Sequence, residues 1–155
     1  MELVYFDLKH AQKTHDKIIE ISGGIQGAID LGRLDSIIDQ IKNDDYYPEF
    51  EDKLTHLVYS VNKGHCFTDG NKRTSIALGA FFLEVNALET FVNKFIIEME
   101  NIAVGVADNV ISKALLGEIV ISILAEDEFS ESLKLKVIAA LQNEQQQIEG
   151  SSNEF

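Results

Sequence analysis

Residues 65–73 gather most of the chemically active side chains of this sequence into one short stretch. The stretch reads His65-Cys66-Phe67-Thr68-Asp69-Gly70-Asn71-Lys72-Arg73. Gly70 allows a backbone turn that a residue with a Cβ would resist. An apolar segment with helical character follows at 74–85. The pattern predicts a loop that runs directly into a long helix, around which the rest of the fold is built.

The start of this helix has the character of an anion site. The first N–H groups of a helix have no intrahelical partner and carry partial positive charge. Lys72 and Arg73 add two full positive charges there, although the helix dipole favours acidic residues at that end. A bound phosphate would relieve the repulsion between the two cations and the helix start. The sequence therefore predicts phosphate binding at this position.

A base and a candidate metal ligand precede the helix. Histidine can accept a proton from a hydroxyl at neutral pH, and His65 is placed for that role. Asp69 offers the hard oxygen atoms that Mg²⁺ prefers when it also carries phosphates. Such a set fits phosphoryl or nucleotidyl transfer, because that chemistry depends on positioning and charge stabilisation. A plain helix start with a surface histidine and two surface cations would leave the order of these residues unexplained.

The order His-x-Phe-x-Asp-Gly-Asn-Lys-Arg resembles the signature of the Fic/Doc family, and specifically of its Doc (death-on-curing) branch. Fic proteins usually have Gly where Lys72 stands and a second Arg at the position of Ile76, so both differences favour the Doc branch. Cys66 stands where Pro is common, which alters the stiffness of the loop. Weaker resemblance is found in three flanking segments, 23–36, 57–61 and 82–86. Together the similarity covers roughly residues 1–125.

The resemblance implies a reaction and a role for each residue. In the Doc branch, ATP lies in the opposite orientation to that in the Fic enzymes, and its γ-phosphate passes to a protein hydroxyl. His65 would be the general base and Asp69 the Mg²⁺ ligand, so ATP and Mg²⁺ are the implied cofactors. The implied nucleotide- and phosphate-binding set is Gly70, Asn71, Lys72 and Arg73.

The resemblance also implies partners. The family's usual target is a translation elongation factor, modified on Ser or Thr, and its usual inhibitor is a small antitoxin protein. The leading hypothesis is therefore a Doc-like toxin of a toxin–antitoxin system that acts as a protein kinase. Fic-type transfer of AMP or another nucleotidyl group is the first alternative, and Lys72 and Ile76 count against it. The second is a catalytically silent nucleotide- or antitoxin-binding module, against which the complete motif counts.

Composition narrows the class of protein further. The 155 residues carry a net charge of −13, which disfavours a general binder of nucleic acid or anionic membrane. The single cysteine, Cys66, excludes an internal disulfide and fits a reducing cytosol. The N-terminus lacks the basic region of a signal peptide, and the longest apolar run, 76–83, is too short to cross a bilayer. We expect a cytoplasmic protein without direct nucleic-acid or membrane binding.

Apolar spacing predicts a mainly α fold. The expected architecture is a Fic/Doc-like helical bundle of six or seven helices around the buried helix 71–85, with at most a small β-hairpin or an N-terminal strand. We expect residues 1–125 to form the catalytic domain and residues 126–155 to form a C-terminal helical extension with a polar tail.

Several local features complete the expectation. Asp7 is a plausible N-cap and Gly23 a helix end. Asn86 is expected to end the central helix in a left-handed conformation, and residues 88–92 to be extended. Residues 23–32 fit either a flap beside the loop or a plain connector. His15 is expected to be packed or half-exposed rather than catalytic, and His10 to face solvent.

Overall fold

Within the described part of the chain, the apolar spacing of the sequence corresponds to seven α-helices and one short 3₁₀-helix. The structure is a computed structural model that describes residues 2–125 and 128–153, with side chains as far as residue 143. The elements are α1 (Leu8–Ser22), α2 (Leu31–Gln40), α3 (Phe50–Lys63), α4 (Asn71–Val85), η1 (Glu89–Phe91), α5 (Val92–Ala107), α6 (Lys113–Leu124) and α7 (Glu131–Asn153). Among the described residues, the β-structure is one isolated bridge between Ala28 and Phe67. The predicted mainly α fold is confirmed.

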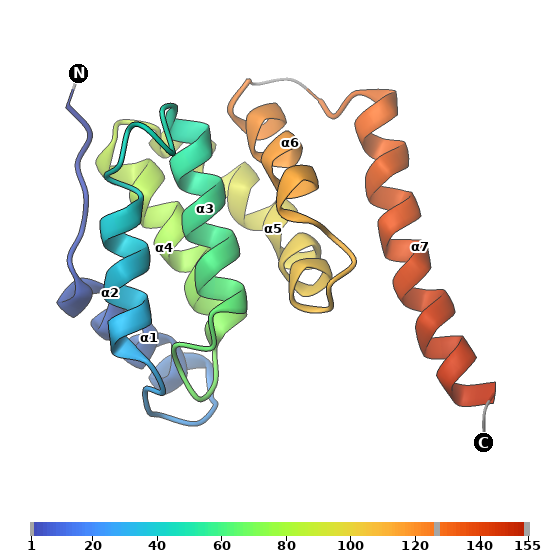
Figure 1. Cartoon of the computed structure of the whole chain (residues 1–155), viewed down its shortest axis with the longest axis horizontal. Helices are drawn as coiled ribbons and strands as arrows, with labels where there is room; N and C mark the ends of the chain where they lie inside the picture. Colours follow the sequence, from blue (N-terminus) through green and yellow to red (C-terminus); the bar gives the residue numbers. More distant parts are fainter. Residues whose placement is uncertain (1, 126–127, 154–155) are drawn as a thin grey trace.

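Helix α4 lies in the middle of the bundle, as its apolar composition predicts (Figure 1). It packs most extensively against α3, and also against α5 and α1. Leu78, Phe82 and Leu83 of α4 are fully buried, and burial of each such side chain stabilises the fold by roughly 1.5–3 kcal/mol. Because α4 is held on several sides, the groups at its N-terminus have a rigid mount.

Most helix ends follow the expected local signals. Asp7 caps α1 by accepting a hydrogen bond of 2.8 Å from the backbone N–H of His10. Gly23, with φ of 89°, ends α1.

His10 is half-buried and stacks on Phe81 with 4.0 Å between ring centroids, so the prediction that it faces solvent is wrong. Its aromatic neighbour on α4 offers more favourable contact than water.

The end of α4 differs from the prediction. The left-handed residue is Ala87, with φ of 61°, whereas Asn86 has φ of −107°. The side-chain amide of Asn86 pairs with both backbone groups of Val4 at 2.7 and 2.9 Å. The side chain of Asn86 thus connects the end of α4 to the N-terminal segment. Residues 88–92 are also not extended, because the backbone of Leu88 bonds into the end of α4 and η1 and α5 follow directly.

The C-terminal helix α7 stands at the edge of the bundle (Figure 1), where it contacts α5 and α6. Among the α7 side chains that the structure describes, Leu133 and Ala140 are buried. Residues 126–127, at the start of the predicted extension, lie outside the described part of the chain. The division into a catalytic domain 1–125 and an extension 126–155 stays a prediction. No helix in the described ranges is both long and apolar enough to cross a membrane.

The close contact between α4 and α5 predicts a clear effect of Gly79→Ala. A Cβ at Gly79 would lie 2.7 Å from Cζ of Phe95 and 2.9 Å from Cγ2 of Val58, both fully buried. Overpacking of this kind costs about 1–3 kcal/mol, partly offset by the helix preference of Ala. We expect the free energy of unfolding to fall by about 1–2 kcal/mol in urea denaturation.

Gly117→Ala on α6 is the matched control. A Cβ there would meet Cγ2 of Thr55 at an ordinary 3.8 Å, so the variant should gain about 0.5–1 kcal/mol from reduced backbone freedom. Equal effects of the two substitutions would contradict the packing described for α4.

Candidate active site

The loop between α3 and α4 begins and ends with special backbone geometry. Gly64 caps α3, its N–H donating to the carbonyl of Ser60 at 2.8 Å. His65 follows with φ of 49°, a left-handed conformation uncommon outside glycine. Gly70, with φ of 79°, opens α4. The side chain of His65 is exposed at this turn, where a second molecule can reach it.

Residues 24–30 lie directly beside the loop. The backbone N–H of Thr68 donates to the carbonyl of Gly27 at 3.0 Å. In the other direction, the N–H groups of Ile29 and Asp30 both donate to the carbonyl of Cys66, at 2.8 and 3.0 Å. The bridge between Ala28 and Phe67 belongs to the same contact. The segment lies where a flap beside the loop would lie, and the choice between a flap and a plain connector stays a prediction.

A buried histidine of α1, His15, contacts the loop. His15 is fully buried and stacks on Phe67 with 3.7 Å between ring centroids and 4° between the planes. Its Nε2 lies 2.7 Å from the backbone carbonyl of Asp69, and its Nδ1 lies 3.0 Å from Oδ1 of Asp16. Of the two expected states, packed or half-exposed, His15 is in the packed one. Its bond to the loop was not foreseen, because helical spacing reports which face is buried and not what that face touches.

Asn71 closes the loop with its side chain. Its Nδ2 donates to the carbonyl of Phe67 at 2.9 Å, and its Oδ1 accepts from the N–H of Phe67 at 3.1 Å. Both ends of the amide are therefore occupied by the loop itself. The side chain of Asn71 braces the loop, while its backbone N–H belongs to the open first turn of α4.

Asp69 presents an ionised carboxylate. The backbone N–H groups of Ile25 and Gly70 donate to its two oxygen atoms at 3.0 and 2.8 Å. These two bonds, and then the charges of Arg73 and His15, hold the pKa of the Asp69 carboxyl below its usual value. The side chain is 42% exposed. A carboxylate has about four acceptor positions, so Asp69 keeps capacity for a cation.

The two cations of the motif differ in their contacts. Arg73 donates from Nη1 to Oγ of Ser22 at 2.6 Å and to the carbonyl of Gly23 at 2.8 Å, and its Nη2 lies 3.8 Å from Asp69. Lys72 is exposed and has no hydrogen bond or ion pair to other side chains in the described part of the chain. The charge of Lys72 is therefore available to a ligand.

A cavity of about 410 Å³ joins these groups. The lining residues come from the end of α3, the loop, the start of α4 and the end of α5: Asn62, His65, Thr68, Asp69, Gly70, Asn71, Lys72, Arg73 and Ala107. All the site residues predicted from the sequence therefore lie around one cavity. Asn62 and Ala107 carry no motif and could not be found from the sequence.

The donor set fits Mg²⁺ of the kind that arrives with a nucleotide. Mg²⁺ in such sites is held by one or two carboxylates together with substrate phosphates, and keeps several waters. Asp69 supplies one ionised, exposed carboxylate at the cavity. Lys72 and the first turn of α4 line the same cavity beside it.

The family model described as the Fic/DOC family matches residues 5–83, a stretch that contains the whole loop. The chain belongs to the Fic/DOC family. Protein kinase doc of Escherichia phage P1 is 35% identical over 102 residues, which are 63% of this chain and 78% of that protein. Toxin Doc of Mycolicibacterium smegmatis (strain ATCC 700084 / mc(2)155) is 34% identical over 71 residues, which are 43% of this chain and 55% of that protein.

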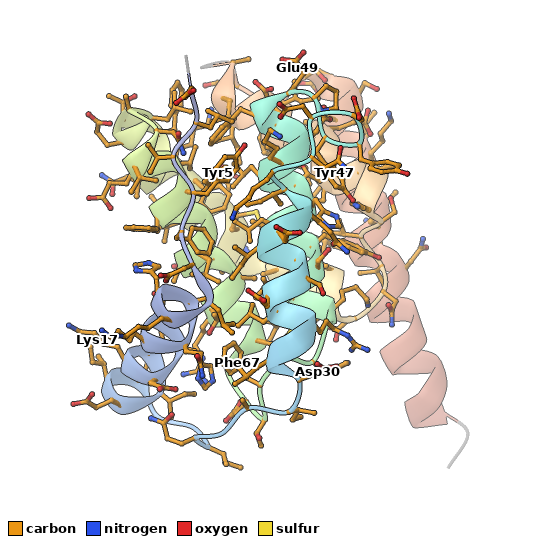
Figure 2. The ribbon with its side chains drawn as sticks, turned by 60° about the vertical axis from the view of Figure 1, so that its left-hand side comes forward. Tyr5, Lys17, Asp30, Tyr47, Glu49 and Phe67 are labelled. Carbon is orange, nitrogen blue, oxygen red and sulfur yellow. The ribbon has the colours of Figure 1, made fainter. Side chains whose placement is uncertain are left out.

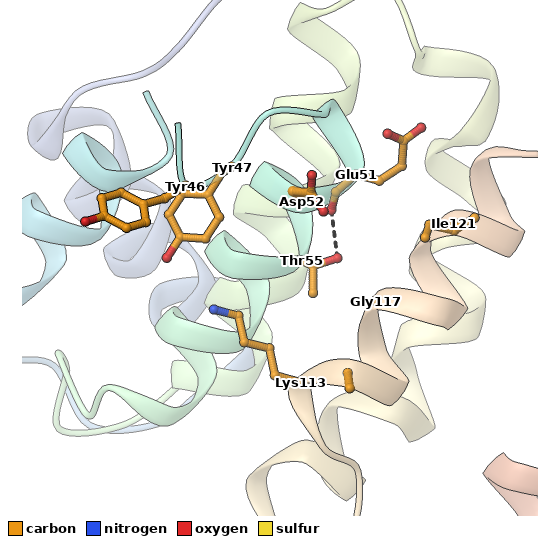
Figure 3. Close-up of a pocket in the computed structure, with 9 residues that line it drawn as sticks. Tyr46, Tyr47, Glu51, Asp52, Thr55, Lys113, Gly117 and Ile121 are labelled. Atoms are coloured by element: carbon orange, nitrogen blue, oxygen red, sulfur yellow. Dashed lines mark hydrogen bonds between the residues drawn. The ribbon is translucent and has the colours of Figure 1, made fainter. Parts of the chain in front are cut away.

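This Fic/DOC chain has a second cavity, of about 360 Å³, at the other end of α3. Tyr47 and Lys113 reach toward each other across it from the two sides (Figure 3). Figure 2 shows Tyr47 and Glu49 at one end of the bundle and Phe67 and Asp30 at the opposite end. The second cavity is therefore remote from the Fic/DOC loop.

His56, beside this second cavity, predicts a pH-dependent stability. Burial, and then the charge of Lys113, lower the pKa of His56 from 6.5 to about 4. The unfolded chain binds this proton near pH 6.5, whereas the folded chain binds it near pH 4. The free energy of unfolding therefore falls as the pH falls from about 6.5 to about 4, by up to about 1.4 kcal/mol per pH unit. Above about pH 6.5, the titration of His56 does not change the stability.

The measurement is urea denaturation at pH 7 and pH 5, with His56→Gln as the comparison. We expect the wild type to lose about 1–2 kcal/mol more than the variant between these two pH values. The carboxyl groups titrate alike in both proteins. An equal loss of unfolding free energy in the wild type and in His56→Gln would therefore contradict the lowered pKa of His56.

Proposed function

We propose that this Fic/DOC protein is a toxin of a toxin–antitoxin system and acts as a protein kinase that moves the γ-phosphate of ATP to a Ser or Thr hydroxyl. The observation that carries the proposal is the position of His65, Asp69 and Lys72 around one cavity at the start of a buried helix. The names of two relatives support it, since one is called a protein kinase and the other a toxin.

In this proposal His65 is the catalytic base. It takes the proton from the target hydroxyl as the phosphorus–oxygen bond forms, a contribution of typically 10²–10⁴ in rate. The exposed position of His65 at the cavity suits a protein substrate, whose hydroxyl must approach from outside. The bond between the β- and γ-phosphates breaks, and ADP leaves.

The start of α4 holds the phosphates. Backbone N–H groups after Gly70 and the ammonium of Lys72 face the negative charge of the transferring group. Arg73 adds charge while its hydrogen bond to the Gly23 carbonyl joins the start of α4 to the end of α1. Asn71 contributes its backbone N–H, since its side chain is bonded to Phe67. Asp69 would hold Mg²⁺, which when bound neutralises phosphate charge.

Fic-type transfer of AMP is the second candidate, and Ile76 counts against it. Ile76 occupies the position of the second Arg of Fic proteins, one turn into α4. It is partly buried and packs against the hydrophobic core. The cations at the start of α4 are therefore Lys72 and Arg73, with Ile76 in place of a second Arg, as in the Doc pattern. A silent binding module is the third candidate, and it would bind ATP without turnover.

The proposal includes partners and location. We infer a protein target, in the first place a translation elongation factor, and an antitoxin as the inhibitor, in the cytoplasm. The net charge of −13 favours cationic protein partners over nucleic acid. Residues 1–125 would carry the catalytic activity, and residues 126–155 would be an extension of it.

The test combines the purified protein, Mg²⁺ and γ-labelled ATP with a purified elongation factor or a cell lysate. We expect label on one protein, and mass spectrometry should locate the phosphate on a Ser or Thr. If ATP binds but label reaches neither a protein nor water, the kinase proposal fails and the silent module is favoured.

A further inference from the structure

His65 needs support from outside its own loop. Its φ of 49° lies in the left-handed region, which residues with a Cβ seldom occupy. Such a conformation persists only where surrounding contacts impose it. The contacts that matter are those to the backbone shortly before and after His65.

The start of α2 supplies contacts on both sides. Nη1 of Arg33 donates a hydrogen bond of 2.6 Å to the carbonyl of Gly64, immediately before His65. Beyond His65, the carbonyl of Cys66, which belongs to the peptide group between Cys66 and Phe67, accepts from two backbone N–H groups of the segment that leads into α2, at 2.8 and 3.0 Å. Residues 29–33 therefore hold the peptide group directly before the candidate base and the second peptide group after it.

Arg33 is itself held in place. Asp30 caps α2 by accepting from the backbone N–H of Arg33 at 2.9 Å, and its other carboxylate oxygen lies 3.7 Å from Nε of Arg33. A Cβ added at Gly64 would lie 3.3 Å from Cδ of Arg33, so the stem of the side chain passes close over Gly64. A hydrogen bond from a charged donor is also stronger than a neutral one.

We propose that Arg33 is a positioning residue for His65: its hydrogen bond to the Gly64 carbonyl keeps His65 in the left-handed conformation that presents the imidazole at the cavity. The inference rests on the proposed kinase function, in which His65 is the base. Arg33 is not among the described residues that line the cavity. Its loss should therefore affect the transfer step and not the binding of ATP.

The test compares three variants of the full chain. Arg33→Ala should lower kcat about 10- to 100-fold, because small misplacement of a reacting group has effects of this size, while KM for ATP stays the same. Arg33→Lys can donate to the same carbonyl and should restore most of kcat. Lys134→Ala removes an exposed cation from α7 and is the charge-matched control, with kcat and KM unchanged.

A second measurement does not depend on activity. The backbone Cα shift and the HN–Hα coupling of His65, assigned by NMR, report the sign of φ. We expect the left-handed signature in the wild type and in Arg33→Lys, and its loss in Arg33→Ala. If the wild type transfers no phosphate but these NMR signatures change as expected, the kinase proposal fails and the positioning role is supported.

Two results would overturn the positioning role. The first is an Arg33→Ala protein with kcat and the left-handed signature of His65 both retained. The second is a fall in kcat that Arg33→Lys does not restore and that accompanies a weaker binding of ATP, which would indicate general damage to the fold.

Discussion

His65→Ala is expected to lower phosphate transfer about 10²–10⁴-fold, the contribution typical of a general base. The binding of ATP should be unchanged, because the phosphates are proposed to bind at the start of α4, where Lys72 is exposed. The substitution also removes no contact of the hydrophobic core, because the side chain of His65 is exposed. The measurement pairs a transfer assay with ATP titration by calorimetry.

His65→Gln sharpens the test, because glutamine keeps bulk and hydrogen bonding but cannot take the proton. It should be as inactive as His65→Ala. His10→Ala, which lies on α1 outside the cavity lining, is the control and should transfer phosphate at the wild-type rate. Transfer by His65→Ala at a similar rate would remove His65 from the mechanism.

Asp69→Asn is expected to lower transfer about 100-fold or more and to raise the Mg²⁺ concentration needed for half-maximal rate. A bound metal supplies several kcal/mol of charge stabilisation, and each 1.36 kcal/mol is tenfold in rate. The substitution also places an amide N–H₂ against the N–H of Ile25 or Gly70, which now meet carboxylate oxygens. We therefore expect a lower melting temperature as well.

Asp108→Asn is the matched control for Asp69→Asn. Asp108 is exposed just after α5, and its substitution changes the net charge by the same amount. Its Mg²⁺ dependence should equal that of the wild type. A Mg²⁺ midpoint that is identical in wild type and Asp69→Asn would show that Asp69 does not hold the metal.

The sequence predicted those parts of the fold that depend on local pattern. Apolar spacing located the helices, and the composition of residues 74–85 indicated a buried central helix, which α4 is. The order of residues 65–73 predicted a loop that opens this helix, with its polar groups gathered at one place. Each of these inferences uses neighbours in the chain, whose relative geometry is set by helix and turn.

Long-range contacts could not be predicted in the same way. The bonds of His15 to the Asp69 carbonyl and of Arg33 to the Gly64 carbonyl join residues far apart in the chain. Lys53 is another example: it is 1% exposed, and its Nζ donates to the carbonyl of Ile41 and to Asp44. No periodicity distinguishes such a buried lysine from a solvent-exposed one, because its partners come from a different segment.

The most direct measurement runs two parallel reactions with ATP labelled on the γ- or the α-phosphate, in the presence of Mg²⁺, the target protein and His65→Ala as the blank. The account predicts label on the target from the γ-phosphate alone, and none with His65→Ala. Label from the α-phosphate would contradict it and would make this Fic/DOC protein a nucleotidyl transferase.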